Sequence, residues 1–196
     1  METPNRIANF LFEIGTMRKL LRSHRQLLMT DDMSDNIASH SYRVAVIGWL
    51  LAEQENVDSA KVVKMCLLHD MAEVRAGDQN YLHKKYIKVF EDEIHKDQLE
   101  GLPIDNVMEL AAEYEERTSP ESIVAKDADL VDQILLLREY AHGGNREAQI
   151  WLDGKGEEGN VQIRNMKTKT ARDVAQSILD TDPSDWWQNI WTEKNR

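Results

Sequence analysis

The sequence predicts an all-α protein that folds as one domain. Apolar residues recur at spacings of three and four along most of the chain, which is the pattern of amphipathic helices. No stretch of useful length alternates between apolar and polar residues, as a half-buried strand would. A chain of 196 residues fits a single hydrophobic core, and its 41% of hydrophobic residues supplies enough apolar surface to build one.

The N-terminal half of the chain predicts three helices. The first spans about residues 3–22, beginning with a capping threonine and a first-turn proline. The second follows the polar segment 30–36 and carries His40 on its apolar face. The third begins after Asp58, a good N-cap, and its apolar stripe ends in His69. Two histidines are therefore expected on inward-facing helix surfaces.

The C-terminal half predicts charged outer helices and one central helix. The outer helices cover about residues 86–94 and 105–116. A long helix begins after Ser119 and is apolar over most of its circumference, which places it in the middle of the bundle. The predicted organisation is one domain, 1–196, with a motif-bearing core at about 7–141, a glycine-rich loop at 142–160, and a helix with a tryptophan-rich tail at 161–196.

Charge and composition exclude several classes of function. The net charge of −11 argues against a nucleic-acid polymer as partner, because phosphate backbones are bound by clustered lysine and arginine. The longest apolar run, 134–137, is far shorter than a membrane span. The single cysteine, Cys66, forms no internal disulfide and is expected in the core, and the start of the chain carries no signal-peptide pattern, so a cytoplasmic protein is expected. Tryptophans near the C-terminus are expected to anchor packing or to form a homodimer contact.

The most informative local string is Leu68-His69-Asp70-Met71-Ala72-Glu73. Adjacent His and Asp side chains on a helix point about 100° apart, so both can reach a metal ion that lies between them. Glu73 follows one helical turn after His69 and suits a role in proton transfer beside such an ion. On its own, a His-Asp pair is more often a hydrogen-bonded pair than a metal site.

Other features give this pair its context. His40 precedes it on the second helix, Gly77-Asp78 follows it, and Lys126-Asp127-Ala128-Asp129 lies on the long helix. The ordered pattern of His, His-Asp and a distant Asp resembles the HD-domain phosphohydrolases. The string from His69 to Asp78 resembles their 5'-deoxynucleotidase branch in particular. The resemblance implies an all-α fold, a single HD-domain helical bundle.

The resemblance also implies roles for individual residues. The implied metal ligands are His40, His69, Asp70 and Asp129. Glu73 and Asp78 are implied in proton transfer, and Arg25 in binding the substrate phosphate. Two imidazoles and two carboxylates suit one divalent ion of manganese, cobalt, nickel, iron or zinc better than calcium. The sequence departs from the family at Gln26, where nucleotidases of the branch carry tryptophan, and at Ser39, where a glutamate is common.

Several alternatives stay open at the level of sequence. A helical wheel places Asp127 nearer the apolar face than Asp129, so Asp127 remains the fallback ligand, and Asp132 is expected to be solvated or capping. His83 and His95 lie among charged residues and are expected at the surface. The glycine pattern at 154–159 neither follows a strand nor opens a helix, and is expected to be a loop without a cofactor.

The expected function is removal of phosphate from deoxynucleoside 5'-monophosphates by a metal-dependent phosphohydrolase, with a small phosphorylated substrate, no nucleic-acid polymer and no membrane as partners. One alternative is hydrolysis of another small phosphate ester or of a nucleoside triphosphate, because the motif fixes the metal before it fixes the substrate. The other alternative function is that of a non-catalytic regulatory module that binds a metal ion. Glu73, Asp78 and Arg25 argue against the module, which would have no evident use for them.

Overall fold

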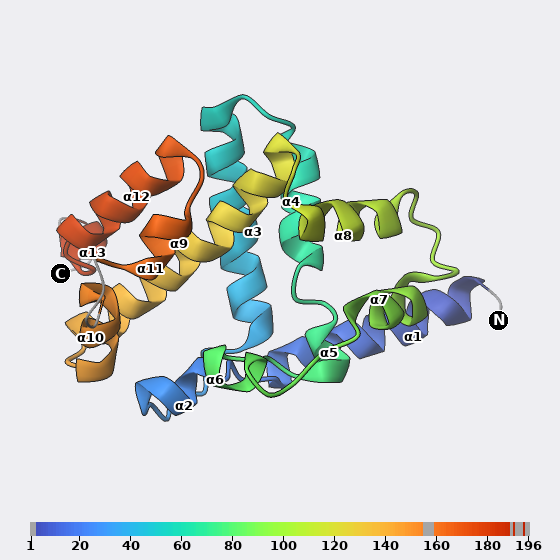
Figure 1. The fold of residues 1–196 in the computed structure, drawn as a ribbon, viewed down its shortest axis with the longest axis horizontal. Helices are drawn as coiled ribbons and strands as arrows, with labels where there is room; N and C mark the ends of the chain where they lie inside the picture. Colours follow the sequence, from blue (N-terminus) through green and yellow to red (C-terminus); the bar gives the residue numbers. More distant parts are fainter. Residues whose placement is uncertain (1–2, 155–158, 189, 191–193, 195–196) are drawn as a thin grey trace.

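The computed structural model describes residues 3–154, 159–188, 190 and 194. Within these residues the regular secondary structure is helical, and the one β-type contact is an isolated bridge between Leu21 and Asn36 (Figure 1). The predicted all-α class is confirmed.

Three long helices form the centre of the molecule: α3 (Ile37–Glu55), α4 (Ser59–Leu68) and α9 (Pro120–His142). Figure 1 shows α3 and α4 side by side, with α9 crossing them obliquely. Gly48 lets α3 approach α4, because a Cβ atom there would lie only 2.6 Å from the sulfur of Cys66. Cys66 is fully buried, as predicted, and burial raises the pKa of its thiol to about 12.

Polar side chains fix where these helices begin. Asp58 accepts a hydrogen bond from the backbone N–H of Lys61, so the predicted N-cap is confirmed. Ser119 likewise accepts from the backbone N–H of Ser122, at the predicted start of the long helix. Asn36 and Ser39 form a reciprocal capping box at the start of α3. Ser39 therefore has a structural role at the position where the family commonly carries glutamate.

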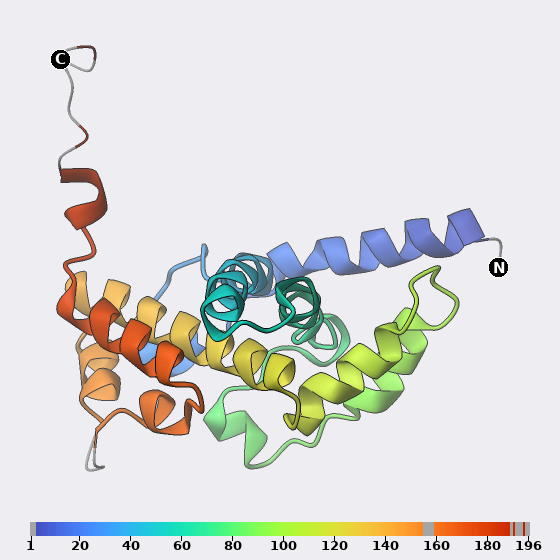
Figure 2. The same ribbon diagram turned by 90° about the horizontal axis from the view of Figure 1, so that it is seen from above.

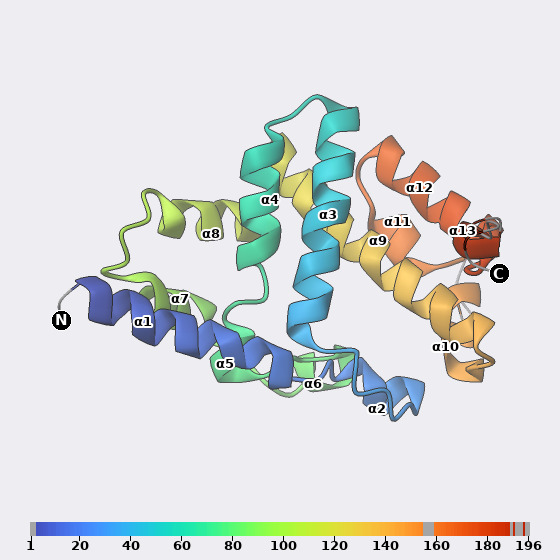
Figure 3. The same ribbon diagram turned by 180° about the vertical axis from the view of Figure 1, so that it is seen from behind.

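A layer of further elements covers one end of the central helices (Figure 3). It comprises α1 (Thr3–Ile14), the 3-10 helix η1 (Gly15–Lys19), α2 (His24–Leu28), α5 (Glu73–Ala76), α6 (Tyr81–Lys84), α7 (Glu91–Leu99) and α8 (Val107–Glu116). The last of these, α8, lies beside α4. The first helix thus ends earlier than residue 22, because the chain tightens into η1 and then extends to form the Leu21 bridge. A second apolar cluster joins the layer to the end of α4 through Phe10, Leu68, Met71, Leu99 and Val107.

The C-terminal part packs along α9 as α10 (Arg146–Asp153), α11 (Val161–Asn165) and α12 (Lys169–Asp180). The expected loop at 142–160 is therefore wrong in part, since Ala148 and Leu152 bury the face of α10. Residues 155–158 of its glycine pattern lie outside the described residues. Helix α13 (Asp185–Gln188) projects from the body, and Trp186 is 79% exposed rather than a packing anchor (Figure 2). Trp191 lies outside the described residues.

Candidate metal centre

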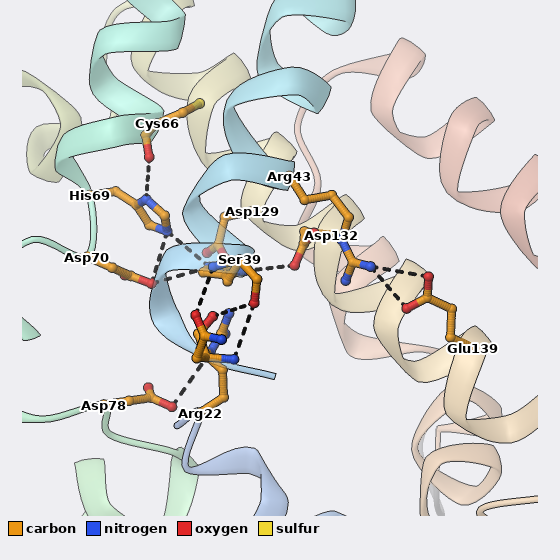
Figure 4. Close-up of polar contacts among 12 residues, drawn as sticks. Arg22, Ser39, Arg43, Cys66, His69, Asp70, Asp78, Asp129, Asp132 and Glu139 are labelled. Carbon is orange, nitrogen blue, oxygen red and sulfur yellow. Dashed lines mark hydrogen bonds and ion pairs between the residues drawn. The ribbon is translucent and has the colours of Figure 1, made fainter. Parts of the chain in front are cut away.

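Four predicted ligands come together where α3, α4 and α9 meet, and Figure 4 labels His69, Asp70 and Asp129 among them. Nε2 of His40 lies 3.2 Å from Nε2 of His69, 3.2 Å from Oδ2 of Asp70 and 3.4 Å from Oδ1 of Asp129. His69 is the C-cap of α4 and Asp70 follows it in a turn, so the pair lies at the end of the helix rather than within it. The turn brings Oδ2 of Asp70 to 3.2 Å from Nε2 of His69.

Hydrogen bonds fix the orientation of both imidazole rings. Nδ1 of His40 lies 2.7 Å from a carboxylate oxygen of Asp132, and Nδ1 of His69 lies 2.7 Å from the backbone oxygen of Cys66. Because carboxylate and carbonyl oxygens accept, both Nδ1 atoms donate, so each Nε2 of a neutral ring carries a lone pair. In the metal-free chain a proton on one Nε2 can bridge the two atoms, and a metal ion can take its place.

The donor set fits a divalent metal ion. His40, His69 and Asp129 offer one ligand atom each, and these atoms lie within 4.8 Å of one another. Ligands about 2.0 to 2.2 Å from one ion are separated by roughly 3 to 3.5 Å, which is close to the separations at His40. Hydrogen-bonded Nδ1 atoms are the usual support of metal-bound histidines. Nitrogen and carboxylate donors together favour transition metals over calcium.

The three aspartates of α9 have different surroundings. Asp129 reaches the His40 cluster, and its second oxygen lies 2.5 Å from Nζ of Lys126. Asp127 is 1% exposed and accepts hydrogen bonds from the backbone N–H groups of Lys167 and Thr168 at the start of α12, which holds it away from the cluster. Asp132 is also 1% exposed, so the expectation of a solvated or capping carboxylate is wrong. Asp132 lies one turn beyond Ala128, so a helical wheel places it on the same apolar face and could have indicated its burial.

The charges at the centre stabilise one another. Burial opposes ionisation of Asp129, but Lys126 and His40 outweigh it and hold the pKa of Asp129 well below its ordinary value. Burial and Arg22 oppose protonation of His40, but the carboxylates of Asp129, Asp132 and Asp70 together raise its pKa well above the ordinary value. A concentration of negative charge that holds a proton on an imidazole is also a strong site for a cation.

A cavity of about 700 Å³ opens beside the cluster and is lined by His69, Asp70 and Asp129. Glu73 and Asp78, the two predicted proton-transfer residues, also line it. Burial first, and then the charges of Asp70 and Asp78, raise the pKa of Glu73 to about 10. Its Oε2 atom is buried without a hydrogen-bond partner.

The structure brings Arg22 to the cavity rather than Arg25. Arg22 is 6% exposed, and its Nε atom lies 3.7 Å from Oδ2 of Asp78. This Nε atom is buried and has no hydrogen-bond partner. Hydrogen bonds from Ser34 lower the pKa of Asp32, and the charge of Arg25 lowers it further. The charge of Arg25 therefore acts on Asp32, which is not part of the metal cluster. Sequence reasoning missed Arg22 because its segment is extended, where helical spacing gives no guide.

The remaining histidines lie outside the metal cluster. His95 is 6% exposed, so the prediction of a surface residue is wrong. It lies on the inward face of α7, and burial lowers its pKa. His83 on α6 is half-buried. In the part of the chain that the structure describes, neither belongs to a group that could hold a second metal ion.

Comparisons with known proteins agree with this geometry. The HD domain family model matches residues 15–180. The 5'-deoxynucleotidase HDDC2 of Xenopus laevis is 30% identical over 149 residues, which cover 68% of this chain and 69% of that protein. The protein of the same name from Dictyostelium discoideum is 28% identical, over 56% of this chain and 64% of its own length. The chain thus spans about two thirds of the relatives it matches.

Solved structures share the fold. A conserved hypothetical protein from Pyrococcus furiosus superposes with a TM-score of 0.71 at 24% identity, covering 89% of this chain and 99% of that one. A predicted metal-dependent phosphohydrolase from Magnetospirillum magnetotacticum superposes with a TM-score of 0.67 at 24% identity, covering 91% of both chains. With the family match and the His, His-Asp, Asp cluster, these findings show that the chain belongs to the HD-domain family of metal-dependent phosphohydrolases.

Proposed function

We propose that this chain removes phosphate from deoxynucleoside 5'-monophosphates and yields a deoxynucleoside and inorganic phosphate. The observation that carries the proposal is the cavity in which the metal cluster, Arg22 and Glu73 face the same space. The relatives named as 5'-deoxynucleotidases support the choice of substrate. His40, His69, Asp70 and Asp129 would hold one divalent transition metal. When bound, such an ion neutralises phosphate charge and lowers the pKa of a water molecule.

Arg22 supplies a binding group for the substrate phosphate. Its guanidinium is buried beside the cavity, and planar guanidinium groups form paired hydrogen bonds with phosphate oxygens. Burial opposes its charge, but Asp70, Asp78 and Asp129 outweigh burial and raise the pKa of Arg22 above its ordinary value. Asp78 is itself held by the backbone N–H of Ser23 and so positions Arg22. This role for Asp78 competes with the proton-transfer role expected from sequence.

Glu73 supplies the proton. Glu73 lines the cavity beside the metal cluster, and in the metal-free chain burial raises its pKa to about 10. A carboxyl group that keeps its proton there can donate it to the alkoxide oxygen that leaves the phosphorus atom. The Oε2 atom of Glu73 has no hydrogen-bond partner within the described protein that would compete for that contact. Glu73 is thus the general acid of the proposed reaction, and the deoxynucleoside is the alcohol released.

A phosphate-release assay tests the proposal. The purified chain is supplied in turn with manganese, cobalt, magnesium and zinc, and with deoxyribonucleoside and ribonucleoside monophosphates. We expect turnover of the deoxyribonucleotides with a transition metal and loss of turnover after chelation. Preferred hydrolysis of a nucleoside triphosphate or a non-nucleotide ester would favour the first alternative. Metal binding without turnover of any ester would favour the regulatory module.

The remaining expectations concern the chain as a whole. Among the described helices, none is long and apolar enough to cross a membrane. The cytoplasmic location, the homodimer and the identity of the native metal stay predictions. Sedimentation of the purified protein tests the dimer, and metal analysis after purification without added salts of these metals tests the native ion.

A further inference from the structure

An uncharged aromatic wall borders the same cavity. Tyr81, at the start of α6, lines the cavity and is 55% exposed. Its ring contacts two others, with centroids 5.7 Å from that of Trp151 and 6.4 Å from that of His24. His24 also lines the cavity and meets the ring of Trp151 edge to face at 5.4 Å. An aromatic ring that stays half exposed beside a cavity offers its surface to a ligand.

A buried residue holds this ring in place. Nε2 of Gln162 on α11 donates to the hydroxyl oxygen of Tyr81 at 3.1 Å, and Gln162 is itself fully buried. Asn160 caps α11 and thereby fixes the position of Gln162. The Tyr81 ring is therefore held by α11, a helix far from α6 in the sequence. Because the ring is already held in place, it loses little conformational freedom when a ligand binds.

Gln133 adds a hydrogen-bond donor to the cavity. It lies one helical turn after Asp129 on α9, lines the cavity and is 8% exposed. Its buried Nε2 atom has no hydrogen-bond partner. A buried amide without a partner carries an unmade hydrogen bond, which an acceptor on a ligand would complete.

We infer that Tyr81 is a stacking surface for the base of the substrate, positioned by Gln162, and that Gln133 donates a hydrogen bond to the same nucleoside. This inference rests on the proposed nucleotidase function and names the residues that recognise its leaving group. Every base presents a flat π surface and a hydrogen-bond acceptor, so the wall accepts purines and pyrimidines alike. It distinguishes nucleotides from simple sugar phosphates.

The test compares thymidine 5'-monophosphate with 2-deoxyribose 5-phosphate, which lacks only the base. Binding of both is measured by calorimetry on the metal-loaded full chain carrying Glu73→Gln to suppress turnover. Tyr81→Leu is expected to weaken nucleotide binding about tenfold and to leave sugar-phosphate binding within twofold, because base stacking contributes about 1 to 3 kcal/mol. Gln133→Met is expected to weaken nucleotide binding by a smaller factor. Tyr81→Phe keeps the ring but removes the acceptor of the Gln162 hydrogen bond, so it is expected to weaken nucleotide binding less than Tyr81→Leu but measurably.

Tyr86→Leu is the matched control, because Tyr86 is 73% exposed and is not among the residues that line the cavity. Equal weakening of both ligands by Tyr81→Leu, or unchanged nucleotide affinity, would overturn the inference. The same measurement separates it from the proposed function, since it needs no turnover. If Tyr81→Leu abolishes the base-dependent part of binding, the subsite is supported. If the wild-type chain, with Glu73 intact, also releases no phosphate, the nucleotidase activity is rejected while the subsite stands.

Discussion

The two sides of the cavity are built differently. The metal side stands on the long helices α3, α4 and α9, and its imidazole Nδ1 atoms are paired with Asp132 and Cys66. The substrate side stands on short elements around residues 22–26 and 73–84. Buried polar atoms without partners gather on that second side, among them Arg22 Nε, Glu73 Oε2 and Gln79 Oε1.

The difference indicates what each side does. Buried polar groups are normally paired, and each unpaired one costs about 1 to 3 kcal/mol. On the metal side, pairing fixes the ligands before any ion arrives, which favours affinity and correct geometry. On the substrate side, unpaired groups keep their hydrogen-bonding capacity for a phosphate or a leaving group. One side is therefore complete without substrate, and the other is not.

The largest expected effect comes from the metal side. The double variant His69→Ala and Asp70→Ala removes two converging ligand atoms, so we expect loss of bound metal and a fall in kcat of at least about a thousandfold. Metal analysis of the purified variant and a phosphate-release assay measure both effects. Retention of one metal ion per chain by this variant would show that the cluster is not the metal site.

The next effect concerns Glu73 on the substrate side. Glu73→Gln keeps the size of the side chain but cannot transfer a proton, so kcat is expected to fall at least about a hundredfold while metal content stays the same. That loss corresponds to about 2.7 kcal/mol of transition-state stabilisation. Near-normal kcat with saturating metal would move the proton-transfer role to Asp78.

The raised pKa of Glu73 also predicts that the stability of the wild-type chain depends on pH, and Glu73→Gln tests this. The raised pKa of Glu73 means that the folded, metal-free chain keeps a proton that the unfolded chain releases above its ordinary value of 4.5. The protonated carboxyl of Glu73 therefore contributes to the free energy of unfolding. This contribution is fully present below that ordinary value and is lost as pH rises toward about 10. The thermal midpoint of the metal-free Glu73→Gln variant should therefore rise relative to wild type between these limits. A difference in midpoint that does not change with pH would contradict the buried, protonated carboxyl.

The metal side was predictable from sequence because helical periodicity and a motif act together there. His40 and His69 lie on apolar stripes, and the caps Asp58 and Ser119 mark where two of the three helices begin. The family pattern chose Asp129 where the helical wheel favoured Asp127. The wheel detected the burial of Asp127 correctly, but it could not tell a carboxylate that caps α12 from one that faces His40.

The substrate side was less predictable because its elements are short or irregular. Arg22 lies in an extended segment whose position depends on the Leu21 and Asn36 bridge, a contact that no local pattern predicts. Helix α10 was hidden in a glycine-rich stretch, although Asn145 caps it and Ala148 and Leu152 share its buried face. His95 was misplaced because charged neighbours hid its inward position on α7.

Arg22 and Arg25 provide a smaller but direct test of the substrate side. Arg22→Met removes a buried guanidinium at the cavity, so KM should rise about tenfold or more, as expected for loss of a charge-assisted hydrogen bond. Arg25→Met is the matched control and should change KM less than about threefold, because Arg25 does not line the cavity. Steady-state kinetics on one nucleotide measures both. The reverse result would restore the assignment of Arg25 made from sequence.

The smallest effect on activity is expected at Asp127, two residues from Asp129 on the same helix. Asp127 accepts hydrogen bonds from the backbone N–H groups of Lys167 and Thr168 and from the Thr168 hydroxyl, so it joins α9 to the start of α12. Asp127→Asn keeps the shape but removes the charge from these bonds, which we expect to cost about 2 kcal/mol of the free energy of unfolding. For a domain of this size that corresponds to a fall in the thermal midpoint of about 4 to 8 °C.

Asp129→Asn provides the matched comparison, since it makes the same chemical change two residues along the helix. Its carboxylate faces His40 and Lys126 rather than a helix start, so metal affinity should fall at least about tenfold. The thermal midpoint of the metal-free chain should also fall, because Lys126 and His40 stabilise the Asp129 carboxylate and hold its pKa well below the ordinary value. Asp127→Asn should instead keep its metal affinity and a kcat within about twofold of wild type once the protein is folded. Metal titration therefore separates the two variants, because affinity should fall only in Asp129→Asn if Asp129 is the ligand and Asp127 the cap. A loss of metal affinity confined to Asp127→Asn would exchange the two roles.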